Sequence, residues 1–169
     1  MTPDELDGYV TSLTALKKEY AADITIYIGL ESEYVPEMLP EQQKFLQNYP
    51  IDYQILGEHF LYPEQRGIYT GKPTDNAAEL KHYVDQVIAG METGNYLYLA
   101  HPDLFHFIGD PALYEQEFRR LCVYLKKSMG SGRKSPELES RFEWQLLHRL
   151  CPRQLRGDSV QCGCDNWQT

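Results

Sequence analysis

Apolar positions near the start of the chain recur at helical spacing. They lie three or four residues apart, at Leu6, Tyr9, Val10, Leu13 and Leu16. This spacing places them on one face of a helix. Thr2 and Glu5 have the spacing of a capping box, and Pro3 occupies the first helical position between them. The first element is therefore predicted to be an amphipathic helix.

Farther along, short segments rich in β-branched and aromatic residues favour strands. They cover residues 24–31, 51–56 and 96–100, and the first contains the alternating Ile24, Ile26 and Ile28. Alternation of this kind places successive side chains on opposite faces of a sheet. Three strands are therefore predicted.

Helical patterns separate these strands. A short helix is predicted over residues 41–47, and a long loop over residues 61–74. Asn76 has the position of an N-cap, and Gly94 that of a C-terminal cap, for a strong helix between them. Its apolar stripe consists of Leu80, Tyr83, Val84, Val87, Ile88 and Met91. A last helix opens at Asp110-Pro111, so the order is α-β-α-β-α-β-α, which is typical of parallel α/β folds.

Length and charge restrict the functions that fit this pattern. With 169 residues the chain suits one domain, but it is short for an eight-stranded barrel, which typically takes about 250. The net charge of -9 argues against a general nucleic-acid or anionic-membrane surface. No apolar run approaches the length of a membrane span, and the start does not have the pattern of a signal peptide. We therefore expect a cytoplasmic protein, with no nucleic-acid or membrane partner.

Each predicted strand ends at, or is followed by, a side chain that can bind a metal ion. Glu31 closes the first strand, and His59 and His101 follow the second and third. Taken singly, Glu31, His59 and His101 are best explained as a solvated loop charge, a core histidine and a turn residue. Taken together they favour a metal site, because the carboxyl ends of parallel strands meet at one edge of the sheet. Carboxylate and imidazole ligands suit zinc, manganese or iron.

Three further residues are candidates for supporting or substrate-binding roles. Glu33 competes with Glu31 for the carboxylate role, and Asp103 is placed to accept a hydrogen bond from the imidazole of His101. His106, in the loop that follows, is expected either to line the site or to be a packing or surface residue. The segment 67–72 lacks the spacing of a phosphate-binding loop, and Cys162-Gly-Cys164 lacks the usual metal-binding spacing.

These motifs resemble the PHP (polymerase and histidinol phosphatase) superfamily, in its histidinol-phosphatase branch. The similar stretches are ITIYIGLESEYVPE, YPIDYQILGEHFL and VDQVIAGMETGNYLYLAHPDLF, within residues 5–125. The resemblance implies a distorted (β/α)7 barrel with two or three divalent metal ions. It also implies hydrolysis of L-histidinol phosphate to L-histidinol and phosphate in histidine biosynthesis. By that resemblance Glu31, His59 and His101 match metal ligands.

The chain departs from the family pattern at both ends. The family's His-x-His and Asp-His pairs, and its later Glu-Ile-Asn and Asp-x-His motifs, do not occur. We therefore expect a partial barrel domain over residues 1–128, lacking the first and last strands. Residues 129–169 show no resemblance and lack the acidic excess of the rest, so we expect an irregular tail that arises from a changed reading frame or gene end.

Two alternatives to an active histidinol-phosphatase-type enzyme follow from these departures. One is an inactive structural remnant, and the other is a different PHP phosphoesterase. The three ligands are fewer than the family's set, so little turnover is expected from this chain alone. The oligomeric state is left open.

Overall fold

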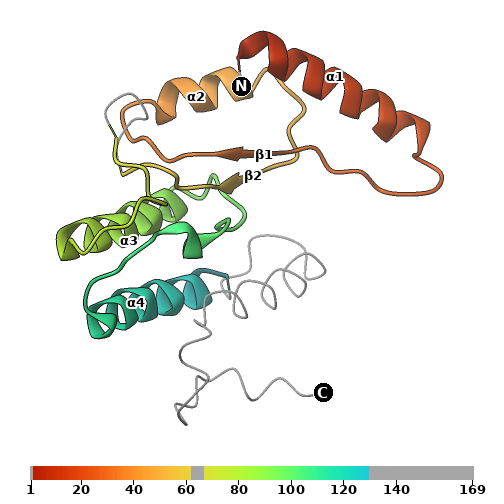
Figure 1. Ribbon diagram of the computed structural model, residues 1–169. Helices are drawn as coiled ribbons and strands as arrows, with labels where there is room; N and C mark the ends of the chain where they lie inside the picture. The colour runs from red at the N-terminus through yellow and green to blue at the C-terminus, as the bar shows by residue number, and fades with distance from the viewer. Residues whose placement is uncertain (1, 62–66, 130–169) are drawn as a thin grey trace, which may run out of the picture.

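A short parallel sheet lies between two pairs of helices in the computed structural model, which describes residues 2–61 and 67–129. The elements are, in chain order, α1 (Pro3–Glu19), β1 (Gly29–Ser32), α2 (Leu39–Leu46), β2 (Tyr53–Leu56), α3 (Ala77–Glu92), the 3-10 turn η1 (Pro102–Leu104) and α4 (Pro111–Met129). In Figure 1, α1 and α2 lie above the strands, and α3 and α4 lie below them. The predicted alternation of helices and strands is confirmed in these residues up to α3, and the third predicted strand is not formed as a strand.

The cap of α1 forms as its sequence predicts. The Thr2 hydroxyl accepts a hydrogen bond from the Glu5 backbone N–H, and the Glu5 carboxylate accepts one from the Thr2 N–H at 2.6 Å. Only the first part of the predicted apolar face is covered: Leu6 and Val10 are buried, whereas Leu16 is 41% exposed. The difference arises because α1 continues beyond the start of β1 in Figure 1, so its last turns have no sheet beneath them.

The first strand is shorter than predicted. It begins at Gly29, and Ile24 and Tyr27 before it are more than half exposed. Alternating apolar residues form a strand only where a neighbouring strand completes their backbone hydrogen bonds. In the described residues β1 pairs with β2 over four positions, from Gly29 opposite Tyr53 to Ser32 opposite Leu56. The prediction of a strand from Ile24 was therefore wrong at its start.

The third predicted strand is present only as a bridge. Leu99 pairs with Leu56 in the parallel sense. The surrounding backbone runs alongside β2 with three hydrogen bonds, from Leu97 N to Gln54 O, from Leu56 N to Tyr98 O and from Ala100 N to Leu56 O. These bonds place the end of this segment beside the end of β2, on the edge of β2 that does not pair with β1.

The main core lies between β2, α3 and α4. Its fully buried members include Leu56 from β2, Leu80 and Val84 from α3, and Leu121 and Leu125 from α4. The predicted caps of α3 are confirmed. The Asn76 side chain accepts from Ala78 N, and Gly94 adopts the left-handed conformation that a helix C-terminus commonly requires.

The described residues thus form an open parallel α/β layer, and closure of a barrel stays an expectation. No helix in residues 2–61 and 67–129 is long and apolar enough to span a bilayer. The expected irregular tail lies outside the described residues beyond Met129, where α4 ends.

Candidate metal centre

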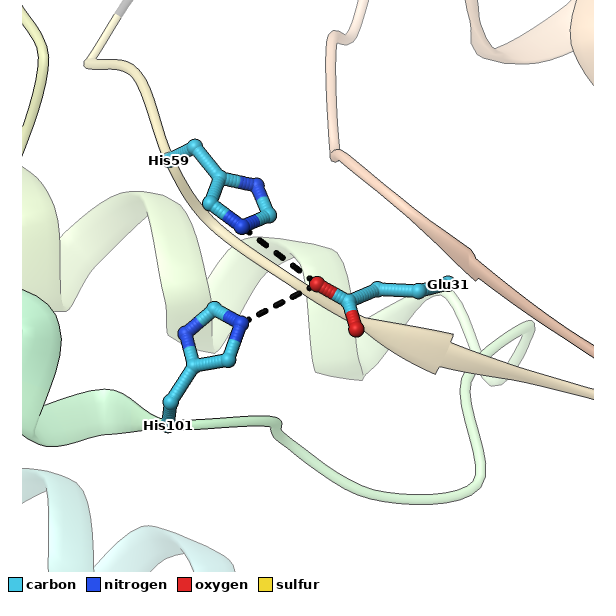
Figure 2. Close-up of side chains that lie close together, drawn as sticks. All are labelled: Glu31, His59 and His101. Carbon is cyan, nitrogen blue, oxygen red and sulfur yellow. Dashed lines mark hydrogen bonds and ion pairs between the residues drawn. The ribbon is translucent and has the colours of Figure 1, made fainter. Parts of the chain in front are cut away.

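Glu31, His59 and His101 converge at one edge of the sheet (Figure 2). Glu31 is the third residue of β1, His59 lies three residues beyond β2, and His101 lies two residues beyond the Leu99 bridge. One ligand atom of each residue lies within 4.8 Å of the others. About a third of each side chain is open to solvent: 38% for Glu31, 33% for His59 and 34% for His101. The cluster is therefore accessible to an ion and to a small molecule.

The distances within this cluster suit a shared cation. Oε1 of Glu31 lies 3.0 Å from Nε2 of His101 and 3.4 Å from Nε2 of His59. Two ligands bound at about 2.1 Å to a tetrahedral ion lie roughly 3.4 Å apart. The two imidazole rings are tilted by 51°, with centroids 4.9 Å apart, so they approach without stacking face to face. One carboxylate oxygen and two imidazole nitrogens make a donor set that fits zinc, manganese or iron.

Glu33 orients His59 rather than joining the cluster. Its Oε1 lies 3.1 Å from Nδ1 of His59, on the opposite side of the ring from Nε2. A carboxylate in this place accepts the Nδ1 proton and leaves the Nε2 lone pair free for a cation. The backbone of Glu33 is held in turn, because its carbonyl accepts a hydrogen bond from Tyr96 at 3.1 Å. The sequence proposed a supporting or substrate-binding role for Glu33, and this geometry fits the supporting one.

His101 has an uncommon backbone conformation. Its φ of 28° makes it the one described non-glycine residue with positive φ. A residue that precedes proline, as His101 precedes Pro102, ordinarily prefers an extended backbone, so this conformation carries strain. Tyr83 stabilises it by donating a hydrogen bond to the buried carbonyl of Pro102 at 3.2 Å. The strained turn directs the imidazole toward Glu31.

The predicted role of Asp103 is not supported by this arrangement. Nδ1 of His101 is buried and has no hydrogen-bond partner among the described residues, so Asp103 does not accept from it. Asp103 is exposed in the 3-10 turn after His101, because that turn directs its side chain to solvent. His106 is also exposed, and only its backbone is engaged, with Thr70 and Thr74. The metal-ligating cluster found in the described residues includes neither side chain.

A buried acid lies directly before His59. Glu58 is 1% exposed, and its Oε1 accepts a hydrogen bond from Nε2 of Gln86 at 2.7 Å. Burial, and then the nearby charge of Glu33, raise the pKa of Glu58 to about 8, although hydrogen bonds from Gln86 and the Tyr34 backbone oppose the rise. Its second oxygen has no hydrogen-bond partner among the described residues. Glu58 is therefore a neutral, protonated side chain near pH 7 in the metal-free protein.

Sequence reasoning did not identify Glu58, Gln86 or Gly57 as parts of this site. Gln86 is a polar residue on the buried face of α3, which is the signal that could have drawn attention to it. Gly57 follows β2 and faces the side chain of Glu31 closely. All three were passed over because their partners lie far away in the sequence.

Comparison with known proteins finds one protein with a similar sequence and one solved structure with a similar fold. No family model matches it. The histidinol-phosphatase of Bacillus subtilis (strain 168) is 38% identical over 63 residues, which are 36% of this chain and 24% of that protein. The crystal structure of hisK from Listeria monocytogenes, a candidate histidinol phosphatase, matches with a TM-score of 0.56 and 21% identity. The match covers 76% of this chain and 57% of the Listeria chain.

These comparisons give the chain a histidinol-phosphatase-like relative and the mixed α/β fold of the Listeria protein. The chain spans about a quarter of the length of the curated relative that it matches, and 57% of the solved one.

Proposed function

We propose that this chain contributes part of the metal centre of a PHP-type phosphatase that acts on L-histidinol phosphate. The observation that carries the proposal is the convergence of Glu31, His59 and His101 from β1, from the end of β2 and from the segment that bridges to β2, with ligand atoms within 4.8 Å of one another. The histidinol-phosphatase-like relative supports the reaction class. A partial domain over residues 1–128, acting in the cytoplasm, is part of this proposal.

Three residues of the site would bind the ion, and a fourth orients one of them. Glu31, His59 and His101 would hold a divalent ion, and Glu33 keeps the Nδ1 side of His59 from competing for it. Bound divalent ions in such sites lower the pKa of a water molecule and neutralise phosphoryl oxygens. The ligand side chains are about one-third exposed, so a phosphate monoester could reach a bound ion from solvent.

Three ligands are fewer than a two- or three-ion centre requires. Zinc in catalytic sites is held by three protein ligands, whereas each further ion needs ligands of its own. We therefore expect this chain to bind one ion and to hydrolyse L-histidinol phosphate slowly or not at all by itself. Further ligands would have to come from outside the described residues 2–61 and 67–129.

Calorimetric titration with Zn²⁺ or Mn²⁺, followed by a phosphate-release assay, tests the proposal. The expected result is binding of one ion that the double substitution H59A/H101A abolishes, with little release of phosphate from L-histidinol phosphate. Absence of binding at millimolar metal would overturn the metal centre and favour an inactive structural remnant. Rapid turnover would instead overturn the expectation that further ligands are needed.

A further inference from the structure

Gln86, on the buried face of α3, donates hydrogen bonds into two loop segments at once. Its side chain is 8% exposed. Nε2 lies 2.7 Å from Oε1 of Glu58, 3.1 Å from the carbonyl of Phe60 and 3.4 Å from the carbonyl of Tyr34. An amide nitrogen carries two hydrogens, so the two shorter bonds are fully made and the Tyr34 carbonyl shares the third, weaker contact. One side chain therefore connects three acceptors.

The amide can serve these acceptors in one orientation only. A rotation that exchanged its oxygen and nitrogen would bring Oε1 against the carbonyl oxygens of Phe60 and Tyr34, which cannot donate and repel it. Oε1 of Gln86 has no hydrogen-bond partner among the described residues, so no donor holds the amide from the other side. Gln86 therefore acts at this position through the N–H groups of its side-chain amide.

The three acceptors belong to the segments that carry two of the cluster's side chains. Tyr34 lies three residues after Glu31, while Glu58 and Phe60 flank His59. The chain reaches His59 and Glu31 from different strands, and Gln86 ties both strand-end segments to the same helix. Its hydrogen bonds thus set the spacing between these segments.

Gly90 brings α3 close enough for this contact. It lies one helical turn after Gln86 on the same buried face. A Cβ at Gly90 would lie 2.9 Å from Cβ of Tyr34 and 3.1 Å from Cδ2 of Leu56, nearer than ordinary packing allows. The helix therefore packs closely against Tyr34 and the end of β2 at Gly90, and reaches both strand-end segments through the amide of Gln86.

We propose that Gln86 is a positioning residue for the metal centre. It holds the Glu31 segment and the His59 segment at the spacing that lets their ligand atoms meet, and it does not touch the ion. The inference rests on the proposed metal site, and it adds a residue from a helix that contributes no ligand.

Three variants test this role. Q86L removes both N–H donors of the amide and replaces it with an apolar side chain of similar size. The exchange E58Q/Q86E keeps a hydrogen-bonded pair between positions 58 and 86 but gives the Phe60 and Tyr34 carbonyls an acidic neighbour. V87A, at a fully buried position of the adjacent core, is the control for general loss of stability.

Two measurements are made on each variant. The first is the nuclear Overhauser effect between the ring protons of His59 and His101 in the metal-free protein, whose ring centroids lie 4.9 Å apart. The second is the Zn²⁺ dissociation constant from calorimetry. Loss of a residue that orients metal ligands typically costs about 10- to 100-fold in metal affinity. We expect that weakening, and loss of the Overhauser effect, in Q86L and in the exchange variant, with both retained in V87A.

The outcomes separate this inference from the proposed function. Loss of the Overhauser effect in Q86L supports the positioning role, even if the unsubstituted chain binds no Zn²⁺ and the metal centre fails. Unchanged ring contacts and affinity in Q86L would overturn it. If Q86L does not fold, the exchange variant decides. Loss of the His59–His101 Overhauser effect in that variant would support the positioning role. Its retention would overturn the role, because Gln86 would then act only through Glu58.

Discussion

Gly57 leaves the space that the side chain of Glu31 occupies. A Cβ at position 57 would lie 2.7 Å from Cδ of Glu31 and 2.8 Å from its Cγ. Gly57 follows the end of β2, and its backbone N–H donates to the carbonyl of Ser32 at 3.2 Å, which keeps it beside β1. The carboxylate therefore reaches His59 and His101 across a position where any other residue would place its own side chain.

Substitution of Gly57 by alanine should displace the Glu31 carboxylate and weaken binding of Zn²⁺ about tenfold or more. The measurement is a calorimetric titration. G29A is the matched control, because its Cβ would meet the flexible ring of Tyr53 in the sheet and not the metal cluster. Wild-type affinity in G57A would contradict the role assigned to this glycine.

Substitution of Gly90 by alanine should destabilise the folded chain, even though Gly90 lies within a helix. Alanine normally stabilises a helix interior by roughly 1 kcal/mol relative to glycine. At Gly90 the added methyl group meets Tyr34 and Leu56, and overpacking of this kind costs about 1–3 kcal/mol. We expect a lower midpoint of urea unfolding in G90A, and a higher one in G8A, whose Cβ would meet nothing within 4 Å. Equal gains in both variants would show that α3 does not pack closely here.

Glu58 should make the stability of the metal-free protein depend on pH. Burial and the charge of Glu33 raise the pKa of Glu58 from 4.5 to about 8 in the folded chain. Between these values the folded state holds a proton that the unfolded state has lost. The free energy of unfolding should therefore be highest below pH 4.5 as far as Glu58 is concerned, fall as the pH rises toward 8, and level off above it.

The substitution E58Q isolates this contribution, because a neutral amide does not titrate. Relative to wild type, E58Q should gain at most about 4 kcal/mol between pH 5 and pH 8, from the difference in pKa. Urea unfolding in the presence of a chelator measures it. E41Q, at an exposed position in α2, serves as the control and should show little change. A constant difference between E58Q and wild type across this range would show that Glu58 is ionised in the folded chain.

Divalent metal should stabilise the fold through the two histidines. A ligand present at 100 times its dissociation constant raises the free energy of unfolding by about 2.7 kcal/mol. We expect Zn²⁺ to raise the thermal midpoint of the wild type, and not that of H59A or H101A. H106A, which removes an exposed imidazole outside the cluster, should retain the shift. An equal shift in H59A and H101A would place the bound metal elsewhere.

Much of the local structure could be predicted from the sequence. The capping box at Thr2 and Glu5, the cap at Asn76 and the glycine at position 94 all form as expected. These features depend on residues within one or two helical turns, so the signal for each lies in a short stretch of the chain. The strand lengths were less predictable, because Ile24, Ile26 and Ile28 alternate like strand residues but precede the start of the strand at Gly29, and Ile24 is more than half exposed.

The sequence by itself determined the helices, the two strands β1 and β2, and the placement of Glu31, His59 and His101 at or after three successive segments of the sheet, because periodicity and caps are local. Tertiary structure alone decided which side chains support them. It paired Glu33 with His59, directed Asp103 to solvent, and buried Glu58 against Gln86. Glu33 and His59 are 26 positions apart and meet because β1 pairs with β2, whereas Glu58 and Gln86 are 28 positions apart and meet because α3 packs against the sheet.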